Sequence, residues 1–163
     1  MGCYIIIRGP AGVGKTTVAK KLASRLSACI VFLDEIMANH RLDTVIGDGI
    51  SAENFIRGNE IILKEVKSIL EKDGTVIIDA CFYRKGHIDH LIKSLPYRHF
   101  IFTLKASVRE CIKRNEGRIK PMSKQDIIDV HKLVSGHEVG IPIDTEEKTA
   151  DDVAEGILAY IQK

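Results

Sequence analysis

Residues 9–17 combine glycines, a lysine and two hydroxyls in an order that can hold phosphate groups. Their letters, GPAGVGKTT, satisfy the spacing G-x-x-x-x-G-K-[ST], in which backbone N–H groups surround phosphates, the lysine reaches the outer phosphates and the hydroxyl binds Mg²⁺. Gly12 and Gly14 allow the backbone to turn inward. The residues predicted to bind the nucleotide in this segment are Gly9, Ala11, Gly12, Val13, Gly14, Lys15, Thr16 and Thr17.

Two aspartates, Asp34 and Asp79, lie near the ends of short apolar runs. In an open parallel sheet, ligands bind outside the carboxyl ends of the strands, so we expect both acids beside the phosphate-holding loop. Asp79, in the run TVIIDA, is predicted to join Thr16 at the metal. Asp34 is predicted to face the acceptor and take a proton from an attacking hydroxyl. The neighbouring Glu35 could compete for that role, and either aspartate could instead cap a helix or turn.

Arginines supply the positive charge that phosphoryl transfer requires. Arg114 and Arg118 are four residues apart in RECIKRNEGR and share a helical face if the helix continues through Gly117. Two guanidinium groups so placed can clamp a transferring phosphoryl group, although a solvated basic helix end is the structural alternative. On the substrate side, beside Asp34, the candidate contacts for an anionic acceptor are Arg41, Arg57 and Arg84, each of which could also be a surface charge.

The elements that position these residues alternate between short β-rich runs and helical patterns, which predicts the α/β class. We expect a three-layer, doubly wound sheet of five parallel strands. The predicted strands cover residues 3–9, 29–34, 75–80, 99–105 and 141–143. The predicted helices cover residues 15–27, 52–72 with Ser51 as N-cap, 107–117, 124–135 and 150–161.

Composition excludes several classes of protein. The 163 residues suffice for one domain, and a formal net charge of +2 is too small to predict binding to nucleic acid or to a membrane surface. No apolar stretch approaches the ~18 residues of a membrane span, and we expect no signal peptide. The four cysteines lack metal-binding spacing, so reduced thiols and a cytoplasmic location are expected.

The motifs GPAGVGKTT, FLDE, VIIDACFYR, CIKRNEGR and IDTEEKTADDVAEGILAYI together cover nearly the whole chain. On these motifs the chain resembles the small P-loop kinases, a group that spans shikimate, gluconate, adenylylsulfate and adenylate kinases and the polynucleotide 5′-hydroxyl kinase domain. The resemblance implies a P-loop NTPase sheet of order 2-3-1-4-5, with ATP and Mg²⁺ as the phosphoryl donor. It also implies a single kinase domain over residues 1–163, an acceptor-binding insert at about 35–72 and a short lid at about 114–125.

The resemblance assigns roles to individual residues. Asp34 matches the acid that accepts the hydroxyl proton, while Arg114 and Arg118 match lid arginines, one stacking on adenine and one reaching the phosphoryl group. Pro142, in PIDTEE, matches the segment that lines the adenine. The predicted catalytic set is therefore Lys15, Asp34, Arg114 and Arg118. DACFYR only loosely matches the DGFPR of adenylate kinases, and the glycine cluster of shikimate kinases is absent.

These observations predict transfer of the γ-phosphoryl group of ATP to a hydroxyl or phosphate of a metabolite or nucleotide, by a monomer or homodimer. An alternative is a polynucleotide or tRNA hydroxyl kinase, which would normally need a broader basic surface. A second alternative, of another class, is a nucleotide-dependent regulatory ATPase or switch, although the guanine-specific N-K-x-D motif is absent. A binding module without catalysis ranks third, because Lys15, Thr16 and the acids are intact.

Overall fold

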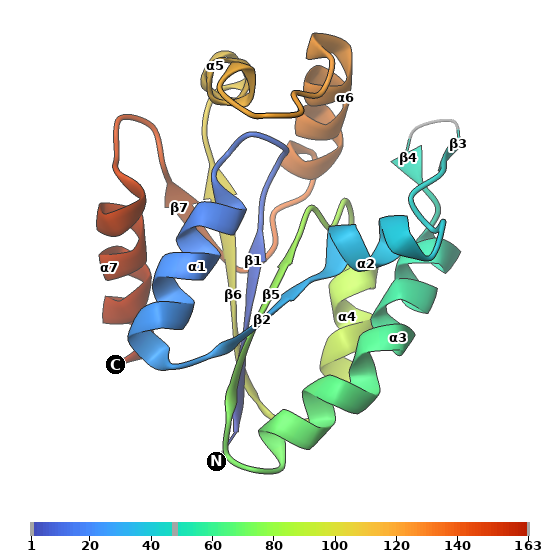
Figure 1. Cartoon of the computed structure of the whole chain (residues 1–163), viewed down its shortest axis with the longest axis vertical. Helices are drawn as coiled ribbons and strands as arrows, with labels where there is room; N and C mark the ends of the chain where they lie inside the picture. Colours follow the sequence, from blue (N-terminus) through green and yellow to red (C-terminus); the bar gives the residue numbers. More distant parts are fainter. Residues whose placement is uncertain (1, 47–48, 163) are drawn as a thin grey trace.

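A parallel sheet of five strands forms the centre of the molecule in the computed structural model, which describes residues 2–46 and 49–162 (Figure 1). The strands are β1 (Cys3–Arg8), β2 (Cys29–Phe32), β5 (Thr75–Ala80), β6 (Arg98–Lys105) and β7 (Ile141–Asp144). They lie in the order β2-β5-β1-β6-β7, and every neighbouring pair is parallel. This architecture confirms the predicted α/β class.

A small antiparallel hairpin, β3 (Val45–Ile46) with β4 (Gly49–Ile50), takes the numbers between β2 and β5. The labels of the large sheet therefore differ from the expected order 2-3-1-4-5, which counts only the five parallel strands along the chain. The sequence did not predict this hairpin, because strands of two residues carry no periodic signal.

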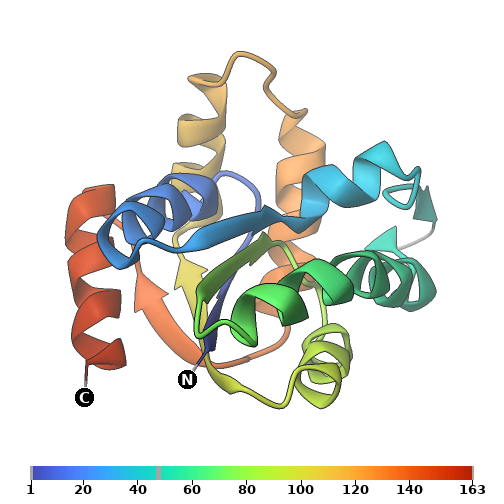
Figure 2. The ribbon, with the colours of Figure 1, turned by 60° about the horizontal axis from the view of Figure 1, so that its bottom comes forward.

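Helices cover both faces of the sheet, as Figures 1 and 2 show from two directions. On one face lie α1 (Lys15–Leu26) and α7 (Ala150–Ile161), and on the other lie α2 (Leu33–Asn39), α3 (Ala52–Leu70) and α4 (Lys85–Ser94). The remaining two helices, α5 (Val108–Glu116) and α6 (Lys124–Ser135), stand above the carboxyl edge of the sheet. None of the helices in the described ranges combines the length and hydropathy needed to cross a bilayer.

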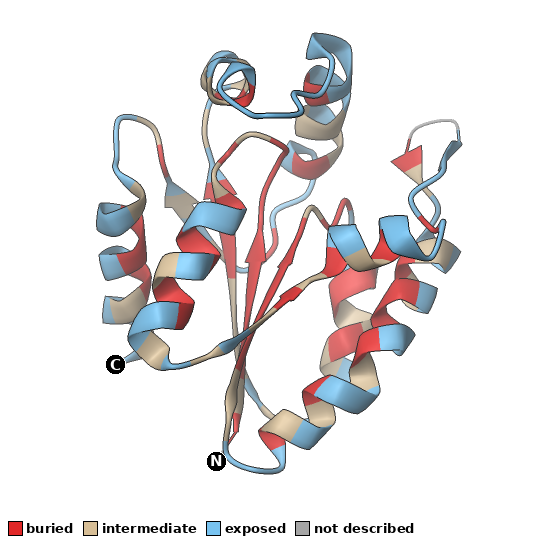
Figure 3. Cartoon of the chain, in the orientation of Figure 1, coloured by how far each residue is buried: buried red, intermediate tan, exposed pale blue. Residues whose placement is uncertain are grey.

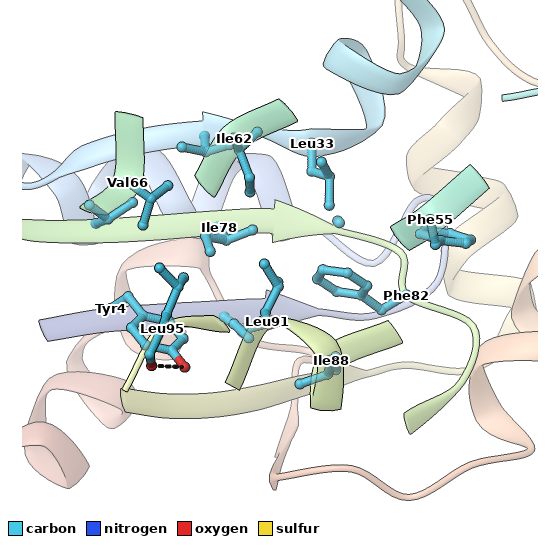
Figure 4. Packing of buried hydrophobic residues seen from close by; sticks show 14 of the residues in the cluster. Tyr4, Leu33, Phe55, Ile62, Val66, Ile78, Phe82, Ile88, Leu91 and Leu95 are labelled. Atoms are coloured by element: carbon cyan, nitrogen blue, oxygen red, sulfur yellow. Dashed lines mark hydrogen bonds between the residues drawn. The ribbon is translucent and has the colours of Figure 1, made fainter. Parts of the chain in front are cut away.

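The core consists of two apolar clusters, one on each face of the sheet. In β1, Ile5 and Ile7 face the cluster beneath α1 and α7, whereas Tyr4 and Ile6 face the cluster beneath α3 and α4. This alternation buries both faces of the strand, so its sequence is continuously apolar (Figure 3). Figure 4 shows the second cluster, where the Tyr4 hydroxyl donates to the carbonyl oxygen of Leu95 at 3.3 Å.

The predicted strand over residues 29–34 is wrong at its end. The strand β2 stops at Phe32, and helix α2 begins at Leu33, which places Asp34 in the first turn of a helix. Leu33 and Met37 are both buried and lie four residues apart, which is helical spacing, and a carboxylate in the first turn interacts favourably with the helix dipole. Seven residues are too few for a clear periodic pattern. The sequence analysis also did not predict α4, which has ten residues.

Helix α5 ends at Glu116, one residue before the predicted end. Arg118 therefore lies in the turn that follows, and Arg114 and Arg118 do not share one helical face. In contrast, the predicted Ser51 cap of α3 is confirmed, because its hydroxyl accepts a hydrogen bond from the backbone N–H of Asn54 at 3.2 Å.

Candidate active site

The loop between β1 and α1, residues 9–14, lies at the carboxyl edge of the sheet. Gly12 and Gly14 have φ angles of 82° and 103°, in the left-handed region that favours glycine. A Cβ atom at Gly12 would collide with the carbonyl oxygen of Cys111, so α5 approaches the loop too closely for any side chain there. The backbone N–H groups of this loop and the N-terminus of α1 together favour an anionic ligand.

Lys15, the first residue of α1, is only 8% exposed. Its Nζ donates to the carbonyl oxygen of Pro10 at 3.2 Å and lies 3.4 Å from Sγ of Cys81. Burial by itself lowers the pKa of Lys15, but Cys81 and the carboxylates of Asp79 and Asp34 outweigh it and raise the pKa above the ordinary value. The lysine therefore stays charged at neutral pH and has no direct carboxylate partner in the described residues.

Thr16 and Asp79 meet at the start of α1, as the sequence predicts. The hydroxyl of Thr16 donates to Oδ2 of Asp79 at 2.6 Å. The second carboxylate oxygen, Oδ1, is buried and has no hydrogen-bond partner among the described residues. Burial raises the pKa of Asp79, whereas Lys15 and the Thr16 hydrogen bond lower it. A hydroxyl beside a carboxylate with one unpartnered oxygen fits a hydrated Mg²⁺ ion carried by phosphates.

Asp34 reaches the same place from α2. Both of its carboxylate oxygens accept a hydrogen bond from the backbone N–H of Cys81, at 3.1 and 3.3 Å. This contact fixes an exposed carboxylate to the loop that follows β5. Burial, followed by the charge of Asp34, raises the pKa of the Cys81 thiol to about 12, so the thiol is neutral at physiological pH.

These groups line one cavity of about 490 Å³, which we call the catalytic cavity. Its walls include Gly12, Gly14, Lys15, Thr16, Thr17, Asp34, Glu35, Asp79, Cys81, Arg114, Arg118 and Met122. The structure thus brings the predicted loop, both aspartates and both lid arginines together. Because Glu35 also lines the cavity, it remains a competitor of Asp34.

Arg114 is held by four hydrogen bonds to three residues. Its guanidinium donates to the Glu110 carboxylate at 2.8 Å, to the Val13 carbonyl at 2.9 Å, and to the hydroxyl and carbonyl oxygens of Thr145 at 3.0 and 2.8 Å. These bonds hold the phosphate-holding loop, through Val13, against α5 and Thr145. Arg118, by contrast, is exposed in the turn after α5.

A second cavity, of about 400 Å³, lies on the other side of Arg114 and is lined by residues of α1 and of the segment 145–153. Pro142, predicted to line the adenine, lies within β7 opposite Thr103 and is not among the residues that line this cavity. The residues there are instead Thr145, Glu147, Lys148, Thr149, Ala150 and Val153. We call it the base cavity.

The predicted lid, residues 114–125, comprises the last residues of α5, the loop of residues 117–123 and the first residues of α6, and two hydrogen bonds cross its base. The side-chain amide of Asn115, 2% exposed, donates to the Met122 carbonyl at 2.9 Å and accepts from the Met122 N–H at 3.1 Å. This pairing closes the loop between α5 and α6 at its base and leaves Ile119 fully exposed at its tip.

Arg8, the last residue of β1, was missed by the sequence reading. It is fully buried, and its guanidinium donates to five oxygen atoms. The partners are the backbone carbonyls of Phe82, Tyr83, Val134 and His137 and the hydroxyl of Thr103. Burial lowers its pKa to about 10, which leaves it charged. The available signal was a charged residue ending an otherwise apolar, buried strand.

A further cavity, of about 870 Å³, lies between the β3–β4 hairpin and α6, and we call it the acceptor cavity. Of the three arginines predicted to contact an acceptor, only Arg84 lines it. Arg57 lines a separate cavity with His40 and Glu60. Arg41 is exposed, with a left-handed φ of 56°. The structure therefore does not bring the three arginines together.

Comparisons with known proteins agree with this geometry. A family model described as AAA domain matches residues 5–133. A protein of Thermococcus kodakarensis named "Putative adenylate kinase" is 30% identical, over 98% of this chain and 85% of its own. A "Cytidylate kinase" of Sulfolobus acidocaldarius is 27% identical, over 98% of this chain and 94% of its own.

Solved structures share the fold. A gluconokinase from Sinorhizobium meliloti superposes with a TM-score of 0.76 at 17% identity, over 98% of this chain and 91% of its own. A sugar kinase from Janibacter superposes with a TM-score of 0.80 at 15% identity, over 99% of this chain and 95% of its own. The chain belongs to the AAA-domain family and is a small P-loop kinase similar to the adenylate kinases. It is an ATP-dependent kinase.

Proposed function

We propose that this kinase transfers the γ-phosphoryl group of ATP to a hydroxyl group of a small molecule, with Asp34 as the proton acceptor. One observation carries the proposal: the Asp34 carboxylate, fixed by the N–H of Cys81, lines the same cavity as Lys15, Thr16 and Asp79. A hydroxyl must lose a proton as it attacks, whereas a phosphate acceptor is already deprotonated. A carboxylate held at this point is therefore more useful for a hydroxyl acceptor.

On the donor side, the proposal places the phosphates of ATP in the loop of residues 9–17 and its adenine in the base cavity, beside Arg114. Thr16 and Asp79 would hold Mg²⁺, which when bound neutralises charge on the β- and γ-phosphates. Lys15 contributes a fixed positive charge to the same phosphates. The planar guanidinium of Arg114, already held at the rim, offers a surface on which the base can stack.

In the transfer step, the acceptor hydroxyl gives its proton to Asp34 while its oxygen bonds to the γ-phosphorus. The bond from that phosphorus to the oxygen bridging the β- and γ-phosphates breaks, and ADP leaves with the electron pair. Lys15 and Arg118 stabilise the charge that is spread over the transferring group. In this proposal the segment 35–72 contributes to the acceptor site, and closure of the lid, residues 114–125, excludes water and suppresses hydrolysis.

The proposal treats the chain as one domain that acts in the cytoplasm as a monomer or homodimer. All four cysteines are free, which suits a reducing compartment. A polynucleotide acceptor is less favoured because the net charge of +2 provides little attraction for a phosphate backbone.

The test follows the label of γ-³²P-ATP in the presence of metabolite and 5′-hydroxyl oligonucleotide pools. Asp34→Asn should lower kcat by roughly 10²–10⁴-fold with little change in ATP affinity, since general base catalysis contributes about that much. The matched control is Glu35→Gln, which removes the neighbouring acid and should retain activity. Near wild-type transfer by Asp34→Asn would refute the assignment. Label released only as free phosphate with every acceptor would favour a regulatory ATPase.

A further inference from the structure

The acceptor cavity lies next to the catalytic cavity. Met122 lines both of them. The loop after β5 also runs from one to the other, because Cys81 lines the catalytic cavity and Tyr83 lines the acceptor cavity. Since Cys81 N–H fixes Asp34, a molecule seated against Tyr83 can direct one end toward that carboxylate.

The walls of the acceptor cavity are largely apolar. Val45 and Ile50 come from the hairpin, Tyr83 from the loop after β5, and Val130 and Leu133 from α6. Val45 is 66% exposed, and the adjacent Ile46 is 71% exposed. Apolar side chains left open to water beside a cavity gain free energy when an apolar ligand surface covers them. The occupant should therefore have an apolar face.

Carboxylates outnumber lysine and arginine side chains on the same walls. Among the described residues, Asp43, Asp126 and Asp129 line the cavity, together with Arg84, Lys132 and the imidazole of His137. Asp126 accepts from the Ser123 hydroxyl at 2.6 Å, and Asp129 accepts from the Gln125 amide at 2.9 Å. Neither contact neutralises the carboxylate.

An anionic acceptor would find few cations here. The arginines that the sequence suggested for it, Arg41 and Arg57, lie outside this cavity. A phosphate-bearing acceptor would bring about two further negative charges toward three carboxylates, and like charges placed together oppose binding. This distribution contrasts with the donor side, where Lys15, Arg114 and Arg118 line one cavity.

We infer that the acceptor is a hydroxyl compound with an apolar face and no net negative charge, uncharged or carrying an amine, rather than a nucleoside monophosphate. The inference rests on the proposed function for the transfer step. It extends that function by naming the chemical class that the acceptor cavity selects.

The test uses matched pairs of probes that differ in charge. Adenosine and AMP, cytidine and CMP, and thymidine and TMP differ by a phosphate group, while phenylalaninol and 3-phenyllactate exchange an ammonium for a carboxylate. Calorimetry measures the Kd of each compound for the full chain saturated with a non-hydrolysable ATP analogue. Label transfer from ATP gives kcat/KM for the same compounds. At least one pair should show tenfold or greater preference for the uncharged or cationic member.

A charge-reversal variant locates the preference. Asp129→Lys should reduce the preference at least threefold, because it replaces one of the three carboxylates with a cation. The control is Glu65→Lys, the same change on the exposed face of α3 and outside the acceptor cavity, and it should leave the preference unchanged.

The outcomes separate the two proposals. Tighter binding or faster phosphorylation of the monophosphates or of phenyllactate overturns the inference and leaves the kinase function standing. Binding of none of the probes at millimolar concentration, or an unaltered preference in Asp129→Lys, also overturns it. Tighter binding of the uncharged or cationic members, with ATP split only to free phosphate, supports the inference about the cavity and refutes the transfer function.

Discussion

Different kinds of groups form the surfaces of the catalytic cavity and of the acceptor cavity, which we call the donor side and the acceptor side of this kinase. Around the catalytic cavity, backbone N–H groups, left-handed glycines and bonds from side chains to the backbone define the surface. Around the acceptor cavity, side chains on a hairpin, a loop and α6 define it. A backbone surface depends little on residue identity, whereas a side-chain surface changes with every substitution. The donor side can therefore stay constant within a family while the acceptor side diverges.

Arg8 connects the two sides. It directly precedes the phosphate-holding loop, and it bonds to the carbonyls of Tyr83 and His137, two residues that line the acceptor cavity. Its five partners are all neutral, whereas Lys15, at the other end of the same loop, faces carboxylates. Arg8 thus holds parts of the fold together, whereas Lys15 is available to bind a ligand.

The largest expected effect tests the donor side. Lys15→Ala removes the charge beside the transferring phosphates, and transfer should fall by about 10³-fold, or about 4 kcal/mol of transition-state stabilisation. Lys20→Ala, an exposed lysine on the same helix, is the control and should keep near wild-type kcat/KM. Retention of more than a tenth of the activity by Lys15→Ala would mean that the loop binds ATP without the predicted electrostatic contribution.

The next effect tests the connection. Arg8→Met leaves buried carbonyl groups without donors, so the free energy of unfolding measured in urea should fall by about 3 kcal/mol. In the variant protein that remains folded, KM for the acceptor should rise more than KM for ATP, because the carbonyl groups of Tyr83 and His137 lose their hydrogen bonds to Arg8. Arg109→Met, on the exposed face of α5, should change stability by less than about 0.5 kcal/mol. Equal rises in both KM values would show that Arg8 does not position the acceptor cavity in particular.

The pH dependence of stability tests the packing of His87, which lies in the helix that follows the Tyr83 loop. His87 is 3% exposed and stacks on Phe55 at 4.2 Å, and burial, followed by repulsion from Arg84, lowers its pKa to about 4. The unfolded chain takes up a proton near pH 6.5 and the folded chain does not. Stability should thus be lost as pH falls from about 6.5 to about 4, by on the order of 1–3 kcal/mol.

Urea unfolding of the wild type and of His87→Gln across this pH range measures the effect. The variant lacks the titrating ring, so its curve should be flatter over the same interval. A wild-type curve no steeper than that of the variant would show that His87 is protonated in the folded protein.

The smallest effect concerns the lid. Asn115→Ala removes both bonds to Met122. Because Met122 is 37% exposed, water can replace the lost partners there, and stability should fall by only about 1 kcal/mol. A looser lid excludes water less well, and the ratio of ATP hydrolysis to transfer should rise severalfold. Asn54→Ala, on the first turn of α3, serves as the control for loss of an amide and should leave that ratio unchanged.

The sequence predicted the donor side better than the acceptor side for a physical reason. Residues 9–17 act through a local backbone conformation that a continuous sequence motif specifies. Asp79 lies near the end of β5, paired with Ile7 of β1, and the apolar run around it predicted that strand. Asp34 reached the expected cavity by an unexpected route, because a short helix carries it and the N–H of Cys81 holds it. Its placement depends on packing between segments distant in the chain, which no local pattern encodes.

The acceptor cavity could not be predicted from the sequence. Its walls combine a hairpin of two-residue strands with residues of α6, and only the tertiary fold brings them together. The same is true of Arg8, whose partners extend to His137, 129 positions later in the chain. The three candidate arginines shared a charge but not a location, and charge alone was the reason for selecting them.

The bond network of Arg114 has a consequence for synthesis. Thr145, 132 positions after Val13, is one of the residues through which Arg114 fixes the loop. A ribosome therefore releases the loop long before its anchor, so a nascent chain cannot form the base cavity until the segment before α7 has emerged. A ligand in the base cavity would therefore stabilise the loop only after the segment 145–153 has folded against it, because a ligand stabilises only the state that binds it.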